Sequence, residues 1–309
     1  MRIVFMGTPD FAVSSLEALY ESGHEVVLVV TQPDRPKGRG YTLTPSPVKQ
    51  YALSKGTEVI SPETLKDESI IETLVNADAD LFIVTAYGRI LSKRILDIPK
   101  IGCFNIHASL LPALRGAAPI NRAIMNGDTV GGVTVMFMDE GMDTGDMVLT
   151  KETEIPSEWT AEEYHDRLAE IGKEALTEFL VFAENGNIPR TKQDEALVTY
   201  AAKIGNDDAY LTFNEPAKAV CDRIRGLSPF PGSFFFLNGK RIKVRYAVVS
   251  DGRGEFGTVL STDKGGIEIA CAEGSIIITK LCPEGKGVCD ASSYLNGHKI
   301  ENGTRVNER

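Results

Sequence analysis

The first 150 residues alternate short apolar runs with amphipathic stretches, and this alternation limits the chain to few folds. The apolar runs have the length of strands, and the stretches between them carry apolar residues at helical spacing. Strands that alternate with helices in this way form a mostly parallel sheet covered on both faces. We expect strands at residues 3–7, 25–31, 59–60, 81–85, 101–107, 133–138 and 147–150, and helices at 10–22, 68–76 and 117–125. Ligand sites of such sheets lie beyond the carboxyl ends of the strands.

The chain changes character after a long helix expected at residues 160–185. Thr160 is suited to cap this helix with Glu163 as its capping-box partner, and Pro189 prevents its continuation. After a short helix at 217–225, only β-like runs follow, separated by Gly and Asn-Gly turns, at 233–237, 241–249, 257–260, 266–270 and 275–281. This pattern predicts a small all-β barrel or sandwich. We therefore place a first domain at 1–188, a linker at 189–207 and a second domain at 208–309.

Charge is unevenly distributed along the chain. Residues 206–309 hold 14 basic against 13 acidic residues, whereas the rest of the chain holds 19 against 30, and the net charge is −10. An acidic body argues against general nucleic-acid affinity. It leaves room for a local basic loop with one specific RNA partner.

Other features of the composition narrow the class of protein further. No apolar run approaches the ~20 residues of a membrane span, and the N-terminus lacks the pattern of a signal peptide. The five cysteines have no Cys-x-x-Cys spacing, which favours reduced structural thiols, and the four histidines are scattered, which predicts no metal site. We expect a cytoplasmic monomer without a membrane partner.

Three polar residues suggest chemistry on a carbonyl group. Asn105 and His107 lie at the end of an expected strand, and because side chains alternate along a strand they point the same way. An amide donor beside an imidazole suits a reaction that builds negative charge on a carbonyl oxygen. Asp143, on a loop flanked by Gly141 and Gly145, is suited to hold the imidazole in one tautomer. An ordinary satisfied polar pair is the alternative for Asn105 and His107 alone.

Residues 32–47 form an unusual loop with four prolines and the cations Arg35, Lys37 and Arg39. Long loops in compact domains are usually functional or disordered. Such cations can grip phosphates, and a solvated loop without a partner is the alternative. The preceding Gly7-Thr8-Pro9 turn follows a strand, but it lacks the Gly-x-Gly-x-x-Gly spacing of a dinucleotide site.

Taken together, the motifs resemble the formyltransferase family that uses 10-formyltetrahydrofolate, and within it the branch that acts on methionyl-tRNA. The matching segments are GTPDFA (7–12), TQPDRPKGRG (31–40), PSPVK (45–49), NIHASLLP (105–112), RGAAPI (115–120), MDEGMDTGDM (138–147) and SPFPGSF (228–234). The resemblance implies a Rossmann-like N-terminal domain and an OB-like C-terminal barrel that binds tRNA. It implies transfer of a formyl group from 10-formyltetrahydrofolate to the α-amine of charged initiator methionyl-tRNA, which starts translation.

The resemblance also assigns roles to residues of this chain. It implies Asn105, His107 and Asp143 as the catalytic set, and Arg39, together with Arg35 and Lys37, as tRNA-binding residues. It implies folate contacts by Ser109, Leu110, Leu111, Pro112, Arg89, Ile90 and Leu91. Three alternatives stay open: a formyltransferase acting on a sugar- or nucleotide-linked amine, a hydrolase that releases formate, and a non-catalytic RNA-binding protein.

The chain departs from the family pattern at several points. Ala113-Leu114 stands where a basic or bulky aromatic pair is usual, and Phe230 stands where the C-terminal segment usually has Trp. The second domain is nearly neutral, whereas a tRNA-binding barrel is commonly basic. We expect Phe230 to act as a packing anchor in the core.

Overall fold

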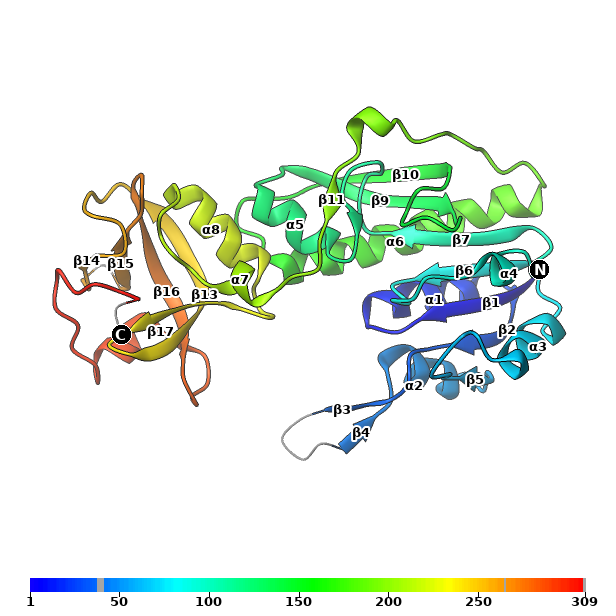
Figure 1. Ribbon diagram of the computed structural model, residues 1–309, viewed down its shortest axis with the longest axis horizontal. Helices are drawn as coiled ribbons and strands as arrows, with labels where there is room; N and C mark the ends of the chain where they lie inside the picture. The colour runs from blue at the N-terminus through cyan, green and yellow to red at the C-terminus, as the bar shows by residue number, and fades with distance from the viewer. Residues whose placement is uncertain (38–41, 264, 308–309) are drawn as a thin grey trace. The chain divides into compact units, whose positions relative to one another are not determined.

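Seven strands form one sheet in the computed structural model, which describes residues 1–37, 42–263 and 265–307 (Figure 1). Their order is β10-β9-β7-β6-β1-β2-β5. Strands β5, β2, β1, β6 and β7 run parallel, and β9 is antiparallel to β7. The bounds are β1 Arg2–Gly7, β2 Glu25–Val30, β5 Val59–Ile60, β6 Leu81–Thr85, β7 Gly102–His107, β9 Val130–Phe137 and β10 Met147–Glu154. The mostly parallel, Rossmann-like sheet predicted from the sequence is confirmed.

Helices cover both faces of this sheet, as its strand pattern predicts. Helices α1 (Phe11–Glu21) and α6 (Ala161–Glu184) share one face, where Lys173 pairs with Glu17 and Phe179 packs on Phe104 of β7. On the other face, α3 (Glu68–Asn76) and α4 (Lys93–Leu96) pack against a core that includes Cys103 of β7. Since side chains alternate along β7, Asn105 and His107 belong to the α3/α4 face.

The segment at 32–47 contains a short hairpin where we expected a loop. Strands β3 (Arg35–Lys37) and β4 (Thr42–Thr44) pair antiparallel, and α2 (Pro47–Ser54) follows with Ser46 as its N-cap. Strands of three residues carry too little periodic pattern to be visible in a sequence. Arg39 lies outside the described residues.

A second, antiparallel sheet follows helix α8 (Ala217–Gly226), in the order β12-β13-β16-β15-β14 with β17 on β16. Its strands are β12 Ser233–Leu237, β13 Lys240–Ser250, β14 Val259–Ser261, β15 Ile267–Ala270, β16 Ser275–Pro283 and β17 Cys289–Asp290, and α9 (Ala291–Leu295) comes last. Residues 303–307 bridge its two edges: Val259 N donates to Thr304 O, and Asn307 N donates to Phe236 O. These bonds curl the sheet around one apolar core, which confirms the barrel-like fold expected for this part.

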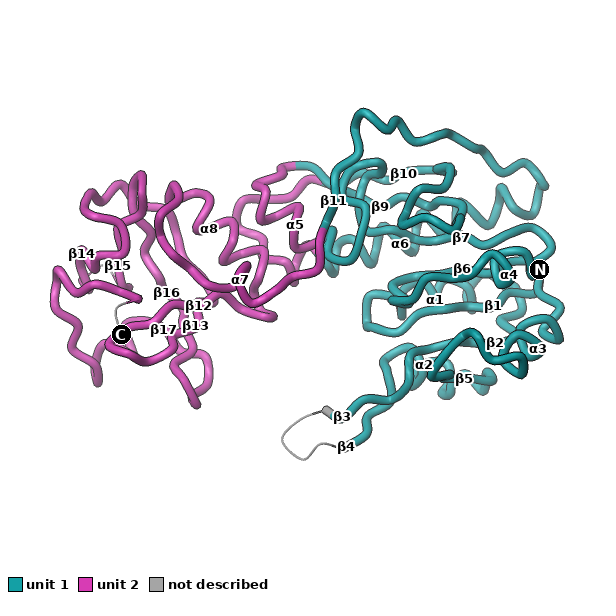
Figure 2. Tube along the Cα trace, in the orientation of Figure 1, with its two compact units in different colours: residues 1–119, 130–153, 165–201 teal, residues 120–129, 154–164, 202–309 magenta. Residues whose placement is uncertain are grey.

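The chain divides into two compact units that interleave in sequence (Figure 2). The first comprises residues 1–119, 130–153 and 165–201, and the second comprises 120–129, 154–164 and 202–309. The second unit therefore includes most of α5 (Pro119–Asn126) and α7 (Asn206–Ala209), as well as Thr160, which hydrogen-bonds to Glu163 as expected for the cap of α6. In the part of the chain that is described, no helix is long and apolar enough to cross a membrane.

Candidate active site

Strand β7 carries two polar side chains toward one carboxylate at its carboxyl end. Asn105 Nδ2 lies 3.5 Å from Asp143 Oδ1, and His107 Nδ1 lies 3.8 Å from the same oxygen. The first distance is at the limit of a hydrogen bond, and the second exceeds it. His107 is only 6% exposed, so water screens its interaction with Asp143 weakly. The structure thus brings together an amide, an imidazole and a carboxylate that are far apart in the sequence.

Asp143 is held in an unusual backbone conformation on the loop between β9 and β10. Its φ of 57° lies in the left-handed region, which non-glycine residues seldom adopt. Its Oδ2 accepts a hydrogen bond of 2.8 Å from the backbone N–H of Gly116. Gly145 has no room for a side chain, because a Cβ there would overlap the carbonyl oxygen of Phe137. The loop therefore presents the Asp143 carboxylate in one direction.

The surroundings of His107 determine which nitrogen of its ring faces Asp143. Nε2 lies 3.1 Å from the carbonyl oxygen of Leu114. A carbonyl oxygen only accepts hydrogen bonds, so Nε2 carries a hydrogen whether the ring is neutral or charged. Nδ1 is then the nitrogen that gains and loses a proton, and it is the one beside Asn105 and Asp143.

The segment that follows β7 forms a tight loop. Ser109 is 1% exposed, and its hydroxyl donates to Ala113 O rather than facing an open site. Leu111 is also buried, and the Leu111–Pro112 peptide bond is cis. Leu110 and Pro112 are half-buried. The side chains of this loop with access to a ligand are therefore Leu110 and Pro112.

The Arg89-Ile90-Leu91 segment follows β6, the strand beside β7. The Arg89 guanidinium donates to Gln32 Oε1 and Glu63 O, and Leu91 is buried in the core. Ile90, by contrast, is 76% exposed. Of these three, Ile90 has the apolar side chain that is free to contact a ligand.

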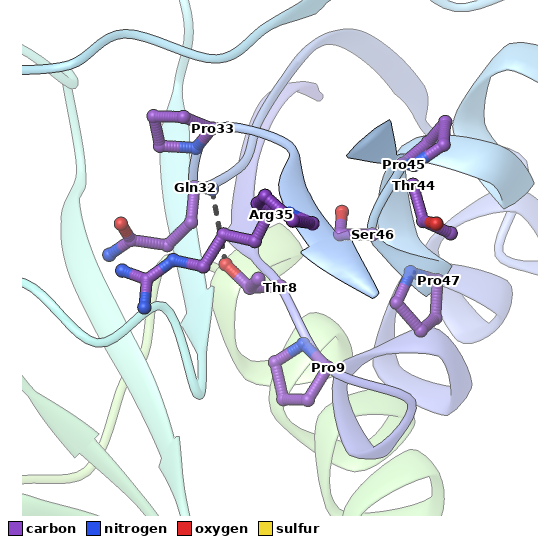
Figure 3. A pocket seen from close by; sticks show the side chains of 10 residues that line it. Thr8, Pro9, Gln32, Pro33, Arg35, Thr44, Pro45, Ser46 and Pro47 are labelled. Carbon is purple, nitrogen blue, oxygen red and sulfur yellow. Dashed lines mark hydrogen bonds between the residues drawn. The ribbon is translucent and has the colours of Figure 1, made fainter. Parts of the chain in front are cut away.

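A pocket of about 360 Å³ lies at the carboxyl ends of β1 and β2 (Figure 3). Arg35 lines it together with Thr8, Pro9, Gln32, Pro33, Pro36, Thr44, Pro45, Ser46 and Pro47. In the close-up, the Arg35 side chain extends alongside Gln32 above Thr8. Lys37 is the last residue of strand β3, two residues after Arg35. Of the three predicted tRNA-binding cations, Arg35 is therefore placed at a cavity.

Our sequence analysis assigned no role to three further residues that support this site. Arg115 is 1% exposed, and Gln193 and Thr199 reach the loops of Asp143 and Leu114 from the expected linker. Arg115 belongs to the RGAAPI motif, but nothing in the local pattern marks the other two. No group of three or more metal-ligating side chains occurs in the residues that the structure describes.

The outer face of β12 and β13 combines cations with aromatic rings. Phe234 pairs with Lys243 and Phe236 with Arg241 across the two strands, and the Arg241 guanidinium stacks 3.7 Å from the Phe234 ring centroid. Arg245 follows on the same strand. Its Nε and Nη1, and Nε of Arg241, are buried without a hydrogen-bond partner among the described residues. Guanidinium nitrogens that are buried without a hydrogen-bond partner carry a desolvation cost.

Phe230 does not occupy the position we expected. It is 81% exposed on the turn between Pro229 and Pro231, so the prediction of a core anchor was wrong. Lys243 Nζ supports this turn by donating to Pro231 O. The turn holds the ring away from the core. An exposed aromatic ring can stack on a nucleic-acid base.

Comparison with known proteins identifies the family. Residues 1–180 match the family Formyl transferase, and residues 203–299 match its C-terminal domain. The chain belongs to this family and is a formyl-group transferase. A protein of Myxococcus xanthus named methionyl-tRNA formyltransferase is 47% identical, over 98% of this chain and 97% of that one. A protein of Geotalea daltonii with the same name is 44% identical, over 100% and 99%.

Solved structures with the same fold are more distant in sequence. An N-formyltransferase from Helicobacter canadensis, solved with folinic acid and dTDP-3-aminofucose, superposes with a TM-score of 0.67 and 20% identity. The match covers 89% of this chain and 98% of that one. Identity at this level shows the fold alone.

Proposed function

We propose that this protein transfers the formyl group of 10-formyltetrahydrofolate to the α-amine of methionyl initiator tRNA. The observation that carries the proposal is the match to proteins named methionyl-tRNA formyltransferase, at 42–47% identity over nearly their whole length. A folate cosubstrate is supported by the family and by the folinic acid in the Helicobacter canadensis structure. The enzyme would act in the cytoplasm as a monomer, without a metal ion.

In the proposed reaction, the neutral α-amine attacks the formyl carbon. A C–N bond forms and the carbonyl electron pair moves to oxygen, which gives a tetrahedral intermediate. Asn105 Nδ2 and protonated His107 Nδ1 would each donate a hydrogen bond to this oxyanion. The charged donor makes the stronger bond. Preorganised donors of this kind are each worth about 3–4 kcal/mol in the transition state.

Asp143 would stabilise the charged form of the ring and help to move protons. When the intermediate collapses, the bond between the formyl carbon and the folate nitrogen breaks, and that nitrogen needs a proton. The attacking amine must lose one. The Asp143 carboxylate lies beside His107, which suits it to relay this proton through a bound water.

We propose folate contacts at the loop after β7 and at the segment after β6. Leu110, Pro112 and Ile90 would offer apolar contacts by their side chains, because they are not buried. Ser109, Leu111 and Leu91 are buried, so they would act through the backbone or by shaping the loops. Arg89 would support the segment through Gln32.

Two surfaces support tRNA as the acceptor over a sugar-linked amine. The first is the hairpin with Arg35 and Lys37. Arg39 belongs to the same sequence segment and lies outside the described residues. The second is the cationic and aromatic face of β12 and β13, to which Lys243 joins the turn that carries Phe230. Residues 206–309 are nearly neutral in total, although several of their cations lie together on this face. We propose residues 208–309 as a tRNA-binding domain, joined by residues 189–207 to the catalytic domain at 1–188.

The decisive experiment supplies the pure protein with 10-formyltetrahydrofolate and several amines. We expect N-formylmethionine on charged initiator tRNA, and much less on a charged elongator tRNA. Formylation of a nucleotide-linked amino sugar in place of tRNA would overturn the proposed acceptor. Release of formate without any acceptor would instead show a hydrolase.

A further inference from the structure

The segment at residues 191–201 lies against both loops of the candidate active site. At one end, the backbone of Thr191 exchanges two hydrogen bonds with Met147, just after the Asp143 loop. At the other end, β11 (Tyr200–Ala201) pairs with β8 (Arg115–Gly116). Between them lies a short 3-10 helix, Glu195–Leu197. Although the sequence suggests a linker, this segment is bonded at both ends.

Gln193 binds the Asp143 loop with its side-chain amide. Its Nε2 donates to the carbonyl oxygens of Asp143 and Gly145, at 2.8 Å each. Its Oε1 accepts from Arg115 Nε at 3.0 Å. Arg115 is 1% exposed and also pairs with the Glu195 carboxylate at 2.9 Å. One amide group thus ties the loop that presents Asp143 to a buried guanidinium.

Thr199 binds the other loop. Its hydroxyl oxygen accepts from the Leu114 N–H at 2.8 Å, and its carbonyl oxygen accepts from the Arg115 N–H at 2.9 Å. The carbonyl oxygen of Leu114 in turn lies 3.1 Å from His107 Nε2. Thr199 is therefore two hydrogen bonds away from the imidazole ring.

Each of these side chains holds a residue whose backbone is unfavourable. Asp143 has a φ of 57° and Leu114 a φ of 60°, and both are non-glycine residues in the left-handed region. Such conformations persist only where the surroundings over-determine them. Gln193 bonds the carbonyl group of one and Thr199 the amide group of the other. The 191–201 segment therefore supplies bonds that hold both backbones in place.

We infer that Gln193 and Thr199 are positioning residues for the formyl transfer: Gln193 orients Asp143, and Thr199 orients His107 through Leu114. The inference that these two residues affect catalysis rests on the proposed function. Misplacement of a reacting group by about 1 Å commonly costs about 100-fold in rate. Loss of either bond should therefore lower kcat and leave substrate binding largely intact.

Thr199 permits a matched test by two substitutions. Thr199→Val keeps the shape and removes the acceptor, whereas Thr199→Ser keeps the hydroxyl. We expect Thr199→Val to lower kcat about 10- to 100-fold and to leave KM for both substrates within about threefold of the wild-type values. Thr199→Ser should keep most of the wild-type kcat. Leu197→Ala, an exposed change in the same segment, should match the wild type. Equal kcat in Thr199→Val and wild type, or equal loss in Thr199→Val and Thr199→Ser, would overturn the role of Thr199.

The position of the ring is measured independently of turnover by ¹⁵N–¹H NMR of histidine side chains. The Nε2–H signal of His107 should shift in Thr199→Val and return in Thr199→Ser. For Gln193, the isosteric Gln193→Leu should lower kcat with unchanged KM. A rise in KM alone, or an unmoved Nε2–H signal in Thr199→Val, would contradict the inference. If the protein formylated another amine, the proposed acceptor would be refuted. The Gln193 and Thr199 variants could still be compared with the wild type on that amine.

Discussion

At the scale of single residues, hydrogen bonding explains how one histidine obtains a defined role. His107 Nε2 is committed to the Leu114 carbonyl group, so the ring cannot rotate without losing that bond. Nδ1 consequently stays beside Asn105 and Asp143. Asp143 is itself held by the Gly116 N–H. His107 and Asp143 are thus each oriented by a backbone partner.

We predict that His107→Asn and Asp143→Asn each lower kcat by about 10²–10³, because the first removes the charged donor to the proposed oxyanion and the second removes the carboxylate that stabilises that donor. Steady-state kinetics of each variant beside the wild type measures the loss. His24→Asn, at a histidine outside the site, is the control and should keep the wild-type kcat. Near-full turnover in either active-site variant would refute the assignment.

At the scale of elements, two helices on one face of the sheet are joined by an ion pair. Asp10 is the N-cap of α1, and its carboxylate lies 3.6 Å from Nε2 of His165, near the start of α6. The Asp10 carboxylate raises the pKa of His165 above its ordinary value, with a further contribution from Asp166, although burial opposes this shift. The interaction also lowers the pKa of Asp10. The strength with which α6 is held to the N-terminus of α1 therefore depends on pH.

The sign of this coupling gives a stability prediction. A histidine whose pKa is raised in the folded state contributes its full stability below the unfolded pKa of 6.5, and loses it as pH rises through the folded pKa. Asp10 contributes its stability above its unfolded pKa of 3.8 and loses it as pH falls through its lower folded pKa. We therefore expect the difference in unfolding free energy between wild type and His165→Gln to be largest near pH 5–6 and to shrink by pH 8–9. Urea unfolding across this range measures it, and a difference independent of pH would contradict the assigned pair.

At the scale of the whole molecule, an acidic chain carries local cationic surfaces. The net charge of −10 should repel a polyanion at long range. The outer face of β12 and β13 opposes this with Arg241, Lys243 and Arg245 and with buried guanidinium nitrogens that have no described partner. A selective, salt-sensitive association with RNA is the expected result.

We predict that Arg245→Gln and Arg241→Gln raise the KM for methionyl-tRNA and leave the KM for the folate cosubstrate unchanged. Each lost phosphate contact should reduce the slope of log affinity against log salt concentration by about 1. The measurement is tRNA binding at several salt concentrations. Lys299→Gln removes one positive charge from an exposed residue of the same unit and is the matched control. Identical salt slopes in all three variants would remove this face from the tRNA-binding surface.

Much of this organisation follows from local sequence patterns. The strands of the first sheet, helix α6 with the Thr160–Glu163 cap, and the β-rich second half are all visible as periodicity and turn residues. The shared direction of Asn105 and His107 follows from alternation along one strand. These features depend on residues close together in the chain, so they can be predicted from a single sequence.

The remainder was decided by contacts between distant segments. The position of Asp143 beside β7 depends on the order of strands and on a left-handed residue, neither of which has a local signal. Phe230 was misjudged because the exposure of a turn residue depends on what packs beneath it. Gln193 and Thr199 resemble ordinary linker residues until the fold brings them to Asp143 and Leu114. The sequence by itself determined the elements and the chemical groups, whereas tertiary structure determined which groups meet, because hydrogen bonds across long sequence separations depend on the packing of the whole unit.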